Sequence, residues 1–93
     1  MYATVRTYSA GSELADALVG SSSAVKELIS GIDGFKAYYL VRTADGAVSI
    51  SVYEDEAGAE KSTKAAAAWI SENLPGVGGV APQVSSGEVV INA

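Results

Sequence analysis

The densest group of chemically capable side chains lies in the segment SISVYEDEAGAEKS, residues 49–62, which carries four carboxylates. Carboxylates can act as general acids and bases or bind hard metal ions. A metal site needs oxygen ligands that converge from several segments, whereas Glu54, Asp55 and Glu56 are neighbours whose side chains diverge. These three and Glu60 lie where an alternating apolar segment gives way to a helical one, and acidic side chains stabilise helix starts. We therefore predict that Asp55 caps a helix and that this segment binds no metal ion.

Trp69 is the next candidate, because an indole ring can form one wall of a binding site for a planar molecule. On a helical wheel Trp69 shares a flank with Ser62 and Asn73. This flank could line a cavity between the helix and a sheet, with Tyr39 on the opposite wall. The alternative is that Trp69 only closes the edge of the core. The candidate ligand-binding residues are thus Trp69, Asn73, Tyr39 and Ser62, and no catalytic residue can be named.

The composition excludes several kinds of chemistry. The chain has no histidine and no cysteine, which removes Ser-His-Asp triads, thiol nucleophiles and the commonest zinc and haem ligands. No cofactor motif is present, so we expect no cofactor. The net charge is −5 and the six Lys and Arg residues are scattered singly, which argues against nucleic acid and anionic membrane surfaces as partners. No apolar run reaches the ~20 residues of a membrane span, and no leader precedes the first alternating segment, so we expect a cytoplasmic protein.

The hydrophobic period predicts the elements that position these side chains. Alternation of period two predicts strands over residues 2–8, 35–43, 48–54 and 83–92, and steps of three and four predict helices over 12–32 and 56–74. The predicted inner stripe of the second helix is Ala59, Thr63, Ala66, Ile70 and Leu74. The order β-α-β-β-α-β, with right-handed crossovers around a central hairpin, gives an α+β, ferredoxin-like sandwich. In this fold a four-stranded antiparallel sheet carries two helices on one face. A chain of 93 residues is one domain, here residues 1–93.

The first predicted helix contains a weak segment, VGSSSAV, because Gly and Ser are poor helix formers. The apolar stripe stays in phase across this segment, so we favour one continuous helix. The alternative is a break near Gly20, after which a second helix starts with Ser22 or Ser23 as its cap.

The central hairpin is predicted from Asp45-Gly46, a pair that suits a two-residue primed turn. This register pairs Val41 with Ile50 and Tyr39 with Val52. Apolar side chains then share one face of the hairpin, and a slip by one residue would destroy that pattern.

The register divides the sheet into two faces. We assign the more apolar face to the helices: Phe35, Ala37, Tyr39, Val41, Val48, Ile50 and Val52, together with Ala3, Val5, Val89 and Ile91. The other face carries tyrosines, cations and serines, and Tyr and Arg are enriched in protein interfaces. We therefore predict a homodimer that forms through this second face, and the alternative is an exposed sheet with aromatic cross-strand pairs. The candidate interface residues are Tyr38, Leu40, Arg42, Ser51 and Tyr53.

The element order, the segment GIDGF before a strand and the segment VSISVYEDEAGAEKSTKAAAAWI at the second helix resemble the dimeric α/β-barrel superfamily, and within it the antibiotic-biosynthesis-monooxygenase-like domains. The resemblance spans nearly the whole chain and implies the ferredoxin-like fold. That superfamily includes cofactor-independent quinone-forming monooxygenases, haem degraders, small isomerases and proteins without known activity. Some of its oxygenases place a Trp and an Asn near an aromatic substrate, which would fit Trp69 and Asn73.

Two functions remain open at this point. The chain is either a non-catalytic homodimeric binding or interaction module, or a cofactor-independent monooxygenase-like enzyme that acts on a small aromatic or polyketide-like substrate. We favour the first, because no convergent acid, base or nucleophile can be assembled from the sequence. In the second, the substrate's own deprotonated form would drive the oxygen chemistry.

Overall fold

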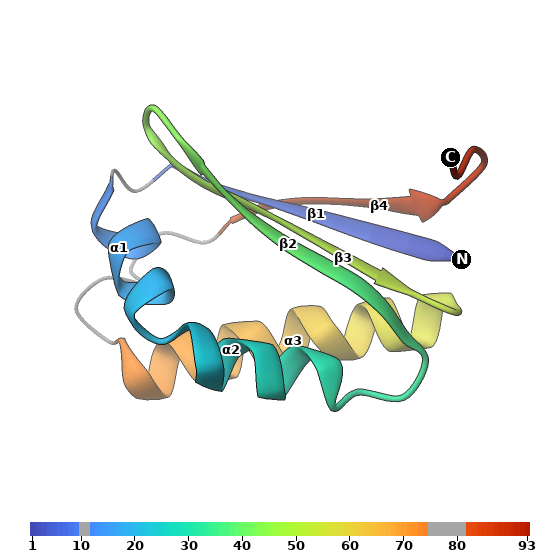
Figure 1. Ribbon diagram of the computed structural model, residues 1–93, viewed down its shortest axis with the longest axis horizontal. Coiled ribbons are helices and arrows are strands. Elements are labelled where there is room, and N and C mark those ends of the chain that lie inside the picture. The colour runs from blue at the N-terminus through green and yellow to red at the C-terminus, as the bar shows by residue number, and fades with distance from the viewer. Residues whose placement is uncertain (10–11, 75–81) are drawn as a thin grey trace.

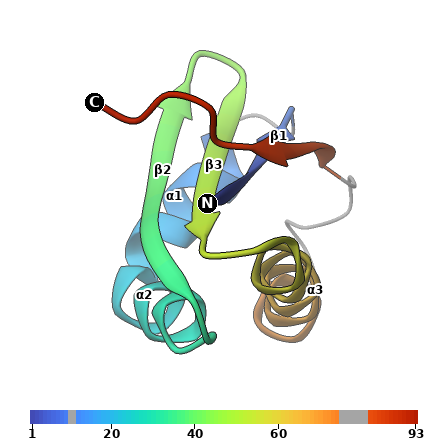
Figure 2. The ribbon, with the colours of Figure 1, turned by 90° about the vertical axis from the view of Figure 1, so that its right-hand side faces the viewer.

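The computed structural model describes residues 1–9, 12–74 and 82–93. The strands in this part are β1 (Tyr2–Tyr8), β2 (Phe35–Thr43), β3 (Gly46–Tyr53) and β4 (Gln83–Glu88), and the helices are α1 (Ser12–Gly20), α2 (Ser22–Ser30) and α3 (Glu56–Asn73). The strands form one antiparallel sheet in the order β2-β3-β1-β4. All three helices lie on the same side of this sheet (Figures 1 and 2). The predicted ferredoxin-like α+β fold is confirmed.

The first helix is broken. The Ser21 N–H donates to the carbonyls of Ala17 and Leu18 at 3.1 and 3.2 Å, which ends α1, and the Val25 N–H donates to the Ser21 carbonyl at 3.0 Å, which begins α2. The prediction of one continuous helix is therefore wrong, and the alternative break near Gly20 is correct. The cap position is Ser21 and not Ser22 or Ser23, and its side chain makes no capping hydrogen bond. Weak helix formers allow the change of direction between α1 and α2 that Figure 1 shows.

The loop of the β2–β3 hairpin lies one residue earlier than predicted, so the partner of each β2 residue on β3 changes by two positions. Val41 pairs with Val48 and Tyr39 with Ile50, so the two-residue loop is Ala44-Asp45. Neither loop residue has a positive φ, so the predicted primed turn is also wrong. A shift by two residues keeps every side chain on its face, and the predicted sharing of faces therefore survives.

The assignment of the two sheet faces to helices and solvent is inverted relative to the prediction. The helix-covered face carries Thr4, Arg6 and Tyr8 from β1, all buried. Beside them on β3, Ser51 and Tyr53 are fully buried. Tyr38 and Leu40 pack against the same core from β2. These side chains lie beneath helices of their own chain, so the prediction that they face a partner is wrong.

Arg42 follows the alternation of Tyr38 and Leu40 but lies at the hairpin end of the sheet, where its side chain is 49% exposed. Its guanidinium forms an ion pair with Asp16 of α1. This ion pair lies within one chain, and the assignment of Arg42 to a dimer interface stays a prediction.

The face without helices is apolar. It carries Ala3, Val5, Ala37, Val48, Ile50 and Val52, which are half-buried, and Tyr39 and Val41, which are 60% and 45% exposed. We call this surface the open face. Alternation had assigned these residues to the core, because an apolar face is normally the one that helices cover. Ile91, assigned to the same core, is exposed because β4 ends at Glu88.

Phe35 is an exception among the residues assigned to the apolar face. The strand pairing shifts between Phe35 and Ala37, a β-bulge that moves Phe35 to the helix-covered side. There its ring meets Tyr53 edge to face, with ring centroids 5.9 Å apart and planes at 72°. A single irregularity therefore changes the face of one aromatic residue.

Helix α3 begins and packs as predicted. The Asp55 carboxylate accepts a hydrogen bond from the Gly58 N–H at 3.0 Å, which confirms the helix cap. Ala59 and Ile70 are buried, and Thr63, Ala66 and Leu74 of the predicted inner stripe are half-buried. No helix in the described part of the chain is long and apolar enough to span a membrane.

Candidate functional site

A groove of about 560 Å³ lies between β2 and the helices α1 and α2. We call it the outer cavity. Its walls are mainly apolar, as is usual for a small-molecule site. Ser22, Lys26 and Ser30 add polar groups along α2. The apolar wall residues are Leu18, Val19, Val25, Phe35, Tyr38 and Leu40.

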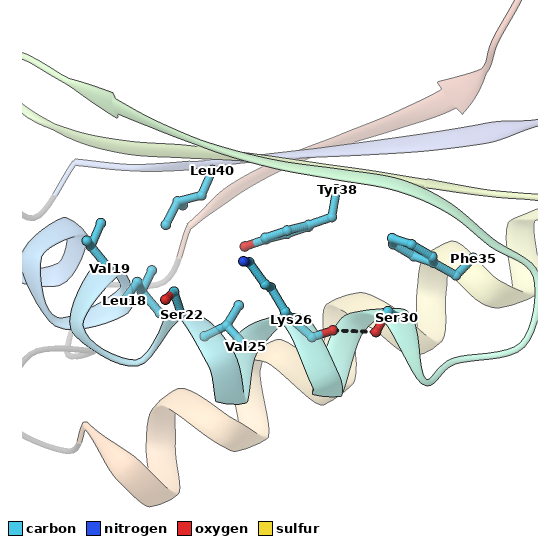
Figure 3. A pocket seen from close by; sticks show the side chains of 9 residues that line it. All are labelled: Leu18, Val19, Ser22, Val25, Lys26, Ser30, Phe35, Tyr38 and Leu40. Atoms are coloured by element: carbon cyan, nitrogen blue, oxygen red, sulfur yellow. Dashed lines mark hydrogen bonds between the residues drawn. The ribbon is translucent and has the colours of Figure 1, made fainter.

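Tyr38 occupies the middle of the outer cavity. Figure 3 shows its ring beneath the sheet and its hydroxyl directed toward the ammonium group of Lys26 on α2. Leu40 and Phe35 flank it along β2 in the same view. A molecule bound here would contact an apolar wall and could reach one phenol and one ammonium group.

A smaller hollow of about 20 Å³ lies deeper in the molecule, between β1, β3 and the helices. We call it the inner hollow. It shares Leu18, Val25 and Tyr38 with the outer cavity, so these three side chains form the wall between the two. Arg6 and Trp69 are among its other lining residues. A space of about 10–15 Å³ is enough for one water molecule, so the hollow has room for a single small polar group.

Arg6 is the most unusual residue of this region, because its side chain is charged and only 1% exposed. Its Nε donates to the Ser49 hydroxyl at 2.9 Å, and Nη2 donates to the Ser51 hydroxyl at 2.6 Å. Its Nη1 donates to the hydroxyls of Ser62 and Thr63 at 3.3 and 3.0 Å. Four neutral hydroxyl oxygens therefore hold the guanidinium.

None of these partners carries a charge. Each of the eleven Asp and Glu side chains lies in a described, exposed position, and within residues 1–9, 12–74 and 82–93 the one ion pair joins Arg42 to Asp16. The guanidinium of Arg6 is thus buried without a carboxylate. A buried charge without an opposite charge is costly, and hydroxyl dipoles offset only part of that cost.

The phenols around Arg6 stay neutral near neutral pH. Burial raises the pKa of Tyr8, of Tyr38 and of Tyr53 above the ordinary value of 10.0, although the positive charge of Arg6 lowers each of them in part. A tyrosinate therefore does not supply the missing negative charge. Tyr8 and Tyr38 both line the inner hollow, and their phenols are neutral groups that can donate or accept hydrogen bonds.

Of the four candidate ligand-binding residues, two lie at or beside the inner hollow and two do not. Trp69 borders the inner hollow, and Ser62 is buried beside Arg6, where its hydroxyl also donates to the Ala59 carbonyl at 2.7 Å. Tyr39 lies on the open face, on the other side of the sheet, which corrects its predicted position opposite Trp69. Asn73 is exposed and donates to the Trp69 carbonyl at 3.0 Å, so its amide is engaged with its own helix.

Arg6 and Lys26 were not among the site residues predicted from the sequence, where they counted among the six scattered cations. One signal was available for Arg6: in the β1–β3 pairing, serines at positions 49 and 51 fall beside it on one face. Small hydroxyl residues at alternate positions next to an arginine are typical of a hydrogen-bonded buried guanidinium.

Comparisons with known proteins show the fold. No family model matches the chain, and no curated protein matches it in sequence. A structure of the haem degrader MhuD from Mycobacterium tuberculosis, with two haems bound in its active site, superposes with a TM-score of 0.73 at 14% identity. That alignment covers 100% of this chain and 99% of MhuD. A protein of unknown function from Nitrosomonas europaea superposes with a TM-score of 0.71 at 19% identity, over 99% of this chain and 90% of that one. At these identities the likeness concerns the fold, and it agrees with the fold that the resemblance to the dimeric α/β-barrel superfamily implied.

Proposed function

We propose that this chain is a homodimeric binding module for a small planar molecule, which lies in the outer cavity. The observation that carries this proposal is the cavity itself: about 560 Å³ of space with apolar walls and a few polar groups, bounded by α1, α2 and β2. Most ligand sites have volumes of roughly 300–1,000 Å³ and similar walls. The flat ring of Tyr38 in its middle favours a planar ligand, which can stack on it.

Binding can be tested with menadione, a neutral and planar quinone. Titration calorimetry measures its affinity, and quenching of Trp69, the only tryptophan, gives a second readout. Ser22→Phe places a ring in the outer cavity and should abolish binding. Ser23→Phe is the matched control, because Ser23 is an exposed neighbour on α2 that does not line the cavity. Equal binding by both variants would show that the ligand does not occupy this cavity.

The homodimer is proposed to form through the open face. A continuous apolar sheet surface is rarely left in water, and two copies related by a twofold axis can cover it with the same surface. The central strands β1 and β3 contribute Val5, Val48, Ile50 and Val52, all half-buried in the single chain. This arrangement leaves the outer cavity free, because the cavity lies on the helix-covered side.

Sedimentation of two valine variants tests this interface. Val41→Lys places a charge on the open face, where Val41 is 45% exposed, and should give a monomer. Val84→Lys is the control, because Val84 is 47% exposed but pairs with Arg6 and so faces the helix side. A dimer that both variants leave intact would refute this interface.

The second candidate is a cofactor-independent monooxygenase-like enzyme acting on a small aromatic or polyketide-like substrate. It is supported by the position of the inner hollow, where Arg6 and Trp69 would lie next to a substrate in the outer cavity. In such a reaction the substrate supplies two hydrogens and two electrons, one oxygen atom of O₂ enters the product, and the other leaves as water. Oxygen uptake with dithranol, compared with the uncatalysed rate, tests it. Binding without any acceleration would leave the binding module as the function.

Haem, which MhuD binds, does not fit the residues of this chain. The sequence has neither histidine nor cysteine to hold the iron. A tyrosine ligand binds iron as the phenolate, and burial raises the pKa of the cavity residue Tyr38. No step of the proposed function therefore involves haem.

A further inference from the structure

The inner hollow offers a positive charge next to the proposed binding cavity. We propose that it is an anion subsite, in which Arg6 pairs with the ionised oxygen of an acidic enol or phenol while the planar body of that ligand lies in the outer cavity. This inference rests on the proposed binding function and adds the chemical class of the ligand.

The electrostatic surroundings of Arg6 favour a bound anion. The Arg6 guanidinium is 1% exposed, and its four hydrogen bonds go to neutral hydroxyls. The described acidic side chains are all exposed, and the segments 10–11 and 75–81 contain no Asp or Glu. A second copy docked on the open face lies on the opposite side of β1 and cannot supply a carboxylate either. A bound anion would supply the opposite charge that the described part of this chain does not bring to Arg6.

Geometry also places the charge beside this space. Arg6 and Tyr8 are both among the residues that line the inner hollow, and Arg6 also interacts with the Tyr8 hydroxyl, whose pKa its charge lowers in part. The guanidinium and this hydroxyl could both donate to one oxygen held in the hollow, and hydrogen bonds to an anion are stronger than bonds to a neutral acceptor.

The size of the hollow selects the kind of acid. About 20 Å³ accepts one oxygen atom and excludes the larger sulfate and phosphate groups. The oxygen of an enol or phenol projects alone from a ring and meets this limit. Leu18, Val25 and Tyr38 form the wall between the outer cavity and the inner hollow, and this wall must move before a ligand can reach both. Figure 3 shows the Tyr38 hydroxyl extending away from β2 into the space beside Lys26. For the ligand to reach both spaces, Tyr38 and its neighbours in this wall would have to move apart.

A pair of naphthoquinones tests the subsite. Lawsone carries an acidic enol that is ionised at neutral pH, and menadione carries a methyl group at the corresponding ring position. The wild-type chain should bind lawsone at least about tenfold more tightly than menadione, since the anion gains charge-assisted hydrogen bonds. Arg6→Met should remove this preference, so that the variant binds lawsone no more tightly than it binds menadione. Arg6→Lys should retain part of the preference.

Lys26→Met is the matched control, because Lys26 is the other cation that lines these spaces. The preference for lawsone should persist in this variant. A preference that survives Arg6→Met and disappears in Lys26→Met would overturn the assignment to Arg6. Equal affinities for lawsone and menadione in the wild-type chain would overturn the subsite but leave the binding function standing, whereas absence of menadione binding would contradict the binding function itself.

A measurement on the wild-type chain keeps the test decisive if the Arg6 variants do not fold. Chloride is small enough for the inner hollow, and gluconate is not. Sodium chloride should weaken the binding of lawsone relative to sodium gluconate at the same ionic strength, and it should not affect menadione. Identical effects of the two salts on lawsone would refute an anion subsite of this size.

Discussion

Tyr53→Phe tests the face assignment on which the proposed sites depend. Tyr53 is 0% exposed, and its hydroxyl donates to the Ile29 carbonyl at 2.6 Å. Ile29 lies in the last turn of α2, where backbone carbonyls have lost their helical partners. This hydrogen bond therefore ties the end of α2 to the end of β3, next to Phe35 at one end of the outer cavity.

The size of the effect follows from what the substitution removes. Phenylalanine keeps the ring, so the edge-to-face contact with Phe35 and the burial of apolar surface are retained. The loss is one buried hydrogen bond, with the Ile29 carbonyl left to the longer bond from the Ile32 N–H at 3.4 Å. We expect a loss of about 1–2 kcal/mol in the free energy of unfolding. For a domain of this size that corresponds to a decrease in Tm of roughly 5–15 °C.

Thermal unfolding followed by circular dichroism, at one fixed protomer concentration, measures this change. Tyr39→Phe is the matched control, because it deletes the same atom from a side chain that is 60% exposed on the open face. It should change the free energy of unfolding by less than about 0.5 kcal/mol. Sedimentation of both variants shows whether either hydroxyl contributes to association.

Unchanged stability of Tyr53→Phe, together with a weakened dimer, would refute the reasoning. That result would place Tyr53 against a partner subunit, and the helices would then cover the other face of the sheet. The outer cavity and the surroundings of Arg6 would have to be assigned again.

Three further predictions concern the helix cap, two glycines and the response to pH. Asp55→Ala should cost about 1 kcal/mol in thermal unfolding, because α3 loses its N-terminal cap, and Asp55→Asn should cost less. Gly46→Ala should prevent or severely weaken folding, since a β-carbon there would overlap the carbonyl oxygen of Tyr8, whereas Gly20→Ala, with nothing within 4 Å, should be neutral or stabilising by up to about 1 kcal/mol. Burial raises the pKa of three tyrosines above 10.0, so the folded chain holds their protons more tightly than the unfolded chain. Their contribution to stability is therefore complete below about pH 10 and should be lost as the pH rises through the raised values, which urea unfolding at several alkaline pH values measures. A stability that rises over that range would contradict the burial of these phenols, which are Tyr8, Tyr38 and Tyr53.

The sequence predicted those features that depend on local chemistry. Asp55 lies between an alternating segment and an amphipathic one, and a carboxylate at such a boundary caps the helix in nearly any tertiary context. The inner stripe of α3, from Ala59 to Ile70, followed from the helical period. The element order then limited the topology to few choices, of which the ferredoxin-like one was correct.

Irregular features of the backbone were harder to predict from the sequence. The bulge between Phe35 and Ala37 moves Phe35 to the helix-covered side, and no residue type in that segment predicts a bulge. The break at Ser21 was one of two readings, because weak helix formers permit a break without requiring one. In both places the choice depends on how the neighbouring elements pack.

The choice between the two faces of the sheet was decided only by the tertiary structure. Alternation showed that the faces differ, but it did not show which one the helices cover. An apolar face is usually the one that helices cover, but in this sheet the helices cover the face that carries Thr4, Arg6 and Ser51. Arg6 shows the physical reason. From the sequence alone, a guanidinium is expected at an interface or at the surface. Here it is buried under the helices because four hydroxyls from β3 and α3 accept its hydrogen bonds, those of Ser49, Ser51, Ser62 and Thr63. The sequence specified each of these hydroxyls, and only the fold brought them to one cation.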